Sequence, residues 1–73
     1  MWIRSQHKES LINCDLVYIE DSWNHDENGY YIYSELDPVL GRYKTKKRCI
    51  EIINEIQSHI DQKREYVFEM PEQ

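Results

Sequence analysis

Apolar and polar residues alternate with the period of a β-strand through most of the first half of the chain. β-branched and aromatic residues dominate the alternating segments. Asn28-Gly29 is a strong hairpin signal, and Pro38 fits only at or just before the start of a strand, because proline cannot donate to a ladder. The pattern predicts four strands, at residues 2–6, 11–20, 30–34 and 39–43.

The second predicted strand changes phase near Asp15. Apolar residues alternate up to Cys14, whereas residues 16–19 are apolar on both faces. A strand accommodates such a change where one extra residue bulges out of the ladder. We therefore expect one strand over 11–20 with a bulge at 13–15.

A helical period replaces the alternation after Thr45, which is a suitable N-cap. The apolar residues form one stripe, which predicts an amphipathic helix over about 45–61 packed on the sheet. Residues 66–70 alternate again and Pro71 follows, as expected for a last strand. The stripe consists of Cys49, Ile52, Ile53, Ile56 and Ile60.

The predicted order is β-β-β-β-α-β, in one domain over residues 1–73. This order is typical of an α+β fold with an antiparallel β-sheet of about four to five strands and one amphipathic helix on one face. One helix leaves the other face uncovered, which favours a homo-oligomer, most simply a dimer, or a bound ligand. The uncovered face is expected to hold much of Trp2, Tyr18, Tyr30, Tyr31, Tyr33 and Tyr43.

Composition excludes several classes of protein. The formal net charge is −5, whereas general nucleic-acid binding requires a broad basic surface. No apolar run is long enough to span a membrane, and the polar N-terminus is unlike a signal peptide, so a cytoplasmic location is expected. Cys14 and Cys49 lie within apolar patterns and are interpreted as reduced core thiols.

The acidic composition contrasts with one basic run. Five of the nine Lys/Arg residues fall within residues 42–48, at the start of the predicted helix, where the helix dipole favours negative charge. This placement suggests that an anion completes a binding site. The alternative, a solvated surface balanced by the surplus acids, stays open. The candidate residues are Arg42, Lys44, Thr45, Lys46, Lys47 and Arg48.

A second candidate cluster lies at the N-terminus. Trp2, Arg4 and Gln6 share one strand face by the period of two. They offer a stacking surface, a planar guanidinium and an amide, which together suit a nucleobase or nucleotide. The alternative for Trp2 is a place in the core.

Signatures of catalysis or metal binding are lacking. His7, His25 and His59 have no HxxxH or CxxC companion, and each is expected to face solvent. Cys14 has no local nucleophile signature. We therefore predict a protein that is not an enzyme and has no cofactor or metal. Trp23, in the polar loop with His25, is interpreted as a lid or a partner contact.

Three segments carry a resemblance: Met1-Trp2-Ile3-Arg4-Ser5-Gln6, Gly41-Arg42-Tyr43-Lys44-Thr45 leading into the helix, and Tyr66-Val67-Phe68-Glu69-Met70-Pro71. The chain resembles a group of very short, uncharacterised proteins of Firmicutes bacteria, their phages and mobile elements. The resemblance implies a fold and a mobile-element setting, and it transfers no catalytic residues. That group often has Glu-Glu-Arg-Ala where this chain has Lys46-Lys47-Arg48-Cys49, so the basic site belongs to this member.

Two functions are consistent with these observations. The first is an accessory counter-defence protein that binds, and sequesters, an anionic nucleotide-like small molecule such as an immune signal. The second is a protein–protein interaction module that inhibits or regulates a host protein through its acidic, aromatic surface. The basic run favours the first.

Overall fold

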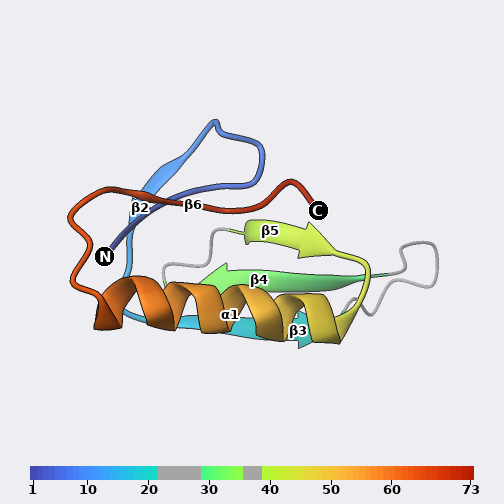
Figure 1. Ribbon diagram of the computed structural model, residues 1–73. Helices are drawn as coiled ribbons and strands as arrows, with labels where there is room; N and C mark the ends of the chain where they lie inside the picture. Colours follow the sequence, from blue (N-terminus) through green and yellow to red (C-terminus); the bar gives the residue numbers. More distant parts are fainter. Residues whose placement is uncertain (22–28, 36–38) are drawn as a thin grey trace.

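The computed structural model describes residues 1–21, 29–35 and 39–73. The predicted Asn28-Gly29 and Pro38 turns, and the loop with Trp23 and His25, lie wholly or partly outside these residues. The described elements are β1 (Trp2–Arg4), β2 (Leu11–Asn13), β3 (Val17–Asp21), β4 (Tyr30–Ser34), β5 (Val39–Tyr43), α1 (Lys46–Asp61) and β6 (Phe68–Glu69) (Figure 1).

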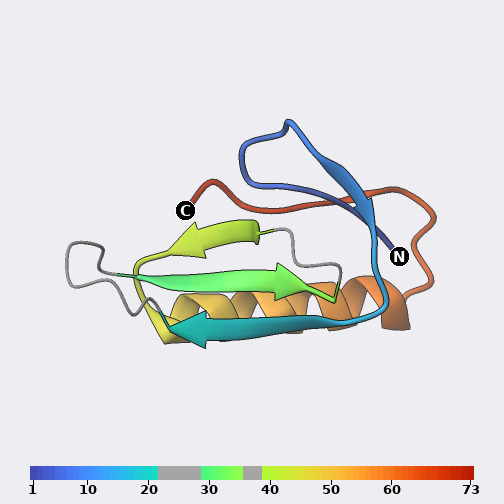
Figure 2. The same cartoon turned by 180° about the vertical axis from the view of Figure 1, so that it is seen from behind.

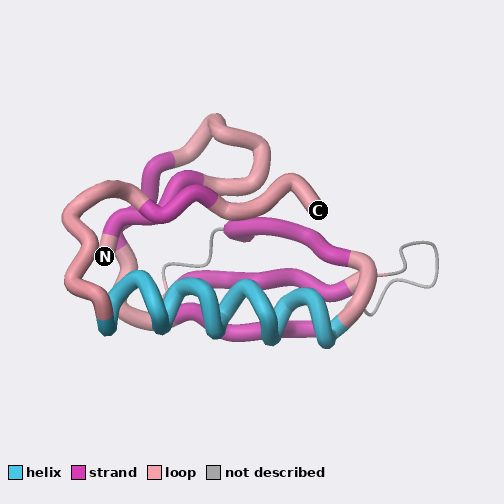
Figure 3. The backbone as a smooth tube through the Cα atoms, in the orientation of Figure 1, coloured by secondary structure: helices cyan, strands magenta, loops and turns pink. Residues whose placement is uncertain are grey.

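The fold belongs to the α+β class, as predicted, with one helix packed on sheets. The described strands form two three-stranded sheets rather than the single expected sheet: β2-β1-β6 and β3-β4-β5. Pairing is antiparallel except between β1 and β6, which run parallel. Figure 3 shows the β2-β1-β6 sheet above the β3-β4-β5 sheet, with the helix along the second sheet.

The chain passes from one sheet to the other at the predicted phase change. The segment 11–20 is two strands of different sheets, joined by Cys14–Leu16, rather than one bulged strand. The main-chain N–H groups of Asp15 and Leu16 donate to the Glu35 carboxylate at 2.8 and 3.0 Å. Glu35 thus satisfies two donors at the turn between the sheets.

Helix α1 begins after Thr45, whose hydroxyl accepts a hydrogen bond from the Arg48 N–H at 3.1 Å. This N-cap confirms the predicted helix start. The buried helix face differs from the predicted stripe, since Ile60 is 55% exposed and Ile53 is only half-buried. The residues that α1 buries are Cys49, Ile52, Ile56 and His59.

The core lies between α1 and the inner faces of the two sheets. Helix α1 covers one face of the β3-β4-β5 sheet, and the view from behind shows the other face open (Figure 2). Tyr30 and Tyr43 lie on the helix side, contrary to prediction, because Tyr43 faces Tyr30 across the ladder and is 3% exposed. Fully buried side chains in this core include Ile3, Ile32, Leu40, Cys49 and Ile52.

The last strand is shorter than predicted. Only Phe68 and Glu69 pair with β1, while Tyr66 is exposed and Met70 is buried beyond the strand. Met70 still donates its N–H to the Arg4 carbonyl at 3.1 Å. Within the described residues, none of the helical segments has the length and apolar character needed to cross a membrane.

Candidate functional site

Three tyrosines cross the open face of the β3-β4-β5 sheet. The ladder pairs Tyr18 with Tyr33, and their stacked rings have centroids 5.7 Å apart. Tyr31 follows on the same side of β4, with its centroid 5.9 Å from that of Tyr33. We call these three residues the tyrosine row. It offers flat aromatic surface on the side of the sheet that α1 does not cover.

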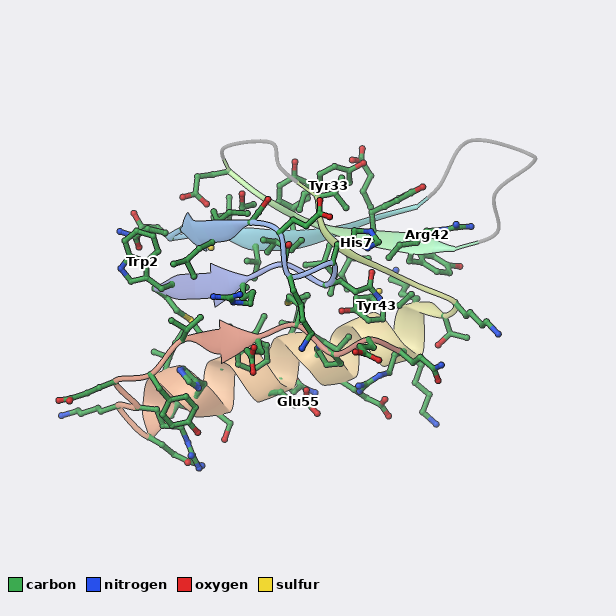
Figure 4. The ribbon with its side chains drawn as sticks, turned by 90° about the horizontal axis from the view of Figure 1, so that it is seen from above. Trp2, His7, Tyr33, Arg42, Tyr43 and Glu55 are labelled. Atoms are coloured by element: carbon green, nitrogen blue, oxygen red, sulfur yellow. The ribbon has the colours of Figure 1, made fainter. Side chains whose placement is uncertain are left out.

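Arg42 extends the tyrosine row onto β5. It is the ladder partner of Tyr31, and its guanidinium carbon lies 6.0 Å from the Tyr31 ring centroid. This is the distance of a cation–π contact. The side chain is exposed at the sheet edge, as Figure 4 shows together with Tyr33. The arrangement places a planar cation at the end of an aromatic surface.

Gln6 binds the edge of β5 beside Arg42. Its N–H donates to the Leu40 carbonyl at 2.7 Å, and its side-chain oxygen accepts from the Arg42 N–H at 2.8 Å. Its Nε2 donates to the carbonyls of Arg42 at 3.0 Å and Glu72 at 2.7 Å. The amide therefore continues the ladder at the edge strand and joins the two sheets.

A groove of about 490 Å³ opens between this edge and the β1–β2 connection. Lys8 and Arg42 contribute positive charge to it, and Glu72 contributes one negative charge. His7 lies near this edge in Figure 4. We call it the Gln6–Arg42 groove; it is lined by Gln6, His7, Lys8, Arg42 and Glu72.

The predicted N-terminal trio does not converge. Trp2 is 51% exposed, so the core alternative is wrong, and Arg4 shares its outward face. Gln6 instead turns to β5. Figure 4 places Trp2 and Arg42 far apart, at opposite sides of the view. The structure thus brings Gln6 and Arg42 together and leaves Trp2 outside that site.

The basic run is also dispersed. Lys44, Lys46 and Lys47 are exposed at the helix start. The Arg48 guanidinium lies 3.5 and 3.9 Å from the carboxylates of Glu51 and Glu55, and its Nε donates to the Gln73 carbonyl at 2.9 Å. The Thr45 hydroxyl is engaged by the helix cap. Arg48 and Thr45 are therefore satisfied within the chain.

His59 corrects the prediction that every histidine faces solvent. It is buried on α1, with Nε2 2.8 Å from the Tyr66 carbonyl oxygen. Its ring packs edge-on against Tyr66 and Phe68 at centroid distances of 5.0 and 5.5 Å. His59 follows Ile52 and Ile56 at helical spacing, which indicates a place on the core face. The prediction missed it because only apolar residues were assigned to the buried stripe. No cluster of three potential metal ligands occurs in the described ranges.

Burial controls the titration of three core groups. It raises the pKa of the Cys14 and Cys49 thiols, both unpaired and buried as expected of core cysteines. It raises the pKa of Tyr43 to about 12, while the Tyr43 hydroxyl donates to the Pro71 carbonyl at 2.7 Å. These thiols stay protonated at neutral pH and are poor nucleophiles.

Comparison of the chain with protein-family models, with curated proteins and with solved structures finds no match.

Proposed function

We propose that the protein binds a small anionic molecule that carries a flat aromatic group, such as a nucleotide. The site consists of the tyrosine row and the Gln6–Arg42 groove. The observation that carries this proposal is the position of Arg42, which contacts the Tyr31 ring and also lines the groove. One side chain thus connects a stacking surface to a polar, partly cationic recess.

The tyrosine row supplies the recognition of the aromatic group. Exposed aromatic side chains on an open sheet stack on nucleobases, and each stacked base contributes roughly 1–3 kcal/mol. Tyr18 is 38% exposed, and Tyr31 and Tyr33 are half-buried, so their rings are held by neighbours and still accessible. Little side-chain freedom is then lost on binding.

The groove supplies the recognition of the anion. A guanidinium binds phosphate or carboxylate through two parallel hydrogen bonds, and a lysine adds a point charge. Arg42 and Lys8 offer both groups, and the net charge of −5 favours a small anion over a long phosphate backbone. The protein acts by holding the ligand, without a catalytic step. Sequestration of a nucleotide signal is the role we propose for this binding, and it is compatible with the mobile-element setting that the sequence resemblance implies.

Thermal unfolding with a ligand panel tests the proposal. The panel contains nucleoside mono-, di- and triphosphates and cyclic dinucleotides, with inorganic phosphate and free nucleosides as partial ligands. A ligand at about 100 times its Kd stabilises the folded state by about 2.7 kcal/mol. For a domain of this size that raises Tm by roughly 10–20 °C. Arg42→Gln should remove the rise.

Arg64→Gln is the matched control, because Arg64 lies 5.6 Å from the Tyr66 ring, outside the proposed site. It should respond to the ligand as the wild type does. The double variant Lys46→Glu with Lys47→Glu separates this site from the helix start: retained binding supports the groove, and lost binding places the anion at the basic run. A panel without any Tm rise contradicts the proposal.

The alternative is a module that contacts a host protein through the same aromatic face. Flat surfaces rich in tyrosine and arginine are typical of protein interfaces, and Val39 is exposed on β5 near Tyr33. Under this alternative no small molecule changes Tm. Tyr33→Glu would then abolish a host-protein contact detected by co-purification.

A further inference from the structure

One side of helix α1 is apolar although neither sheet covers it. Ile50 is 45% and Ile60 55% exposed, Ile53 is half-buried and Gln57 is exposed. These four residues follow each other at spacings of three, four and three, the pattern of the contact seam between two packed helices. Lys46 ends this seam at the helix start. We call Ile50, Ile53, Gln57 and Ile60 the isoleucine seam.

The isoleucine seam lies on the β3 side of the helix. Ile60 lines a pocket of about 260 Å³ together with Leu16 and Val17. The opposite side of α1 faces the C-terminal segment, where Glu55 and His59 line another pocket with Tyr66 and Phe68. Figure 1 shows α1 and β3 along the same lower border of the molecule.

Strand β3 is an edge strand on that same border. In the described ranges it pairs with β4 alone, so its outer main-chain groups face away from the sheet. Exposed strand edges are templates for pairing with a further strand. An open strand edge and an apolar helix seam therefore lie side by side.

The flank of the seam is complementary to itself. Lys47, Asn54 and Asp61 are exposed and stand seven residues apart along one line of the helix. If two copies of α1 pack antiparallel, Lys47 of each copy meets Asp61 of the other, and the two Asn54 side chains meet at the centre. A parallel arrangement would instead place like charges together. The charge pattern thus favours a second, antiparallel copy of the same helix.

We infer that this border is the contact surface of a two-fold symmetric homodimer, formed by the isoleucine seams and the β3 edges. A two-fold axis makes both the helix pair and the strand pair antiparallel. Two copies of the sheet then join into one six-stranded sheet, with both helices on the same face. The two tyrosine rows come to lie on the opposite, shared face.

The two contacts are compatible in register. Val17 and Ile60 line the same pocket, and Figure 1 shows β3 and α1 running in opposite directions. Ile19 is two strand residues beyond Val17, or roughly 6–7 Å, which corresponds to about four helical residues. Ile19 therefore lies beside residue 56. The isoleucine seams of two antiparallel copies are centred on about residue 55. One two-fold axis can therefore pass through the centre of the helix pair and the centre of the β3 pair.

Sedimentation equilibrium of the full chain, in a concentration series up to roughly 100 µM, tests the inference. The wild type should sediment as a dimer. Ile50→Glu places a charge in the seam and should give a monomer with an unchanged circular dichroism spectrum, because Ile50 is outside the core. Leu11→Glu is the matched control, since Leu11 is 50% exposed on the other sheet, and it should remain dimeric.

Exchanging the charges of Lys47 and Asp61 provides a second test, which leaves the core residues unchanged. Lys47→Glu and Asp61→Lys alone each create two like-charge contacts and should weaken the dimer roughly 2- to 30-fold. The double variant restores opposite charges and should recover most of the affinity. A wild type that stays monomeric overturns the inference. So does an Ile50→Glu variant that stays dimeric, or a double variant weaker than both single ones.

Discussion

At the scale of single residues, Gly41 shows why a small residue was needed on β5. A Cβ atom built on Gly41 would lie 2.8 Å from the Tyr43 ring, which is closer than real Cβ contacts. The Tyr43 ring cannot easily move, because it is buried and its hydroxyl is bonded to the Pro71 carbonyl. Gly41 is thus required by a close approach of an aromatic ring.

We predict that Gly41→Ala destabilises the protein by about 1–3 kcal/mol, the usual effect of overpacking. The displaced ring should also lose its hydrogen bond to Pro71. Urea unfolding gives the free-energy change, and near-ultraviolet circular dichroism reports the altered packing of tyrosine. The double variant Gly41→Ala with Tyr43→Leu should show a smaller effect of the alanine. An equal effect in both backgrounds would contradict the steric explanation.

At the scale of elements, the junction between the sheets depends on Glu35. Its carboxylate accepts two main-chain hydrogen bonds across about twenty residues of sequence. The bond from Asp15 is the main cause that lowers the pKa of Glu35 below its usual value of 4.5. The charged carboxylate is therefore favoured in the folded state.

A lowered folded-state pKa contributes stability that is present above the usual pKa and lost as the pH falls through the folded value. We predict that the free energy of unfolding decreases as the pH falls below about 4.5, and that Glu35→Gln shows a smaller decrease. Urea unfolding between neutral and acidic pH measures both slopes. The control is Glu20→Gln, which changes an exposed carboxylate on β3. If Glu35→Gln showed the same dependence of unfolding free energy on pH as the wild type, this role of Glu35 would be contradicted.

Helix α1 illustrates what periodicity can and cannot predict. The length and the Thr45 cap followed from local rules that act within one or two turns. The buried face did not, because it is rotated toward His59 and away from Ile53 and Ile60. His59 entered the core through a hydrogen bond to Tyr66, a residue beyond the helix end. Ile50 and Ile60 stayed outside it.

At the scale of the whole molecule, Gln6 holds the two sheets together. We predict that Gln6→Ala, which removes its side-chain bonds to Arg42 and Glu72, costs about 1–3 kcal/mol. The Arg42 amide should exchange its hydrogen faster than the amides of β4. Glu65→Ala, which truncates an exposed side chain beyond the helix, should cost little. Unchanged exchange at Arg42 would show that the two sheets are joined by other contacts.

The sequence by itself determined the α+β class, the helix bounds, the N-cap and the change of strand phase near Asp15. Each of these depends on residues close together in the chain. Only the tertiary structure decided that Leu11–Glu20 belongs to two sheets, that β1 pairs parallel to β6, and that Gln6 meets Arg42. The last two contacts join Ile3 to Phe68 and Gln6 to Arg42, residues that are 65 and 36 positions apart in the chain. Local sequence patterns allow many strand pairings, and only the packing of the whole chain selects one of them.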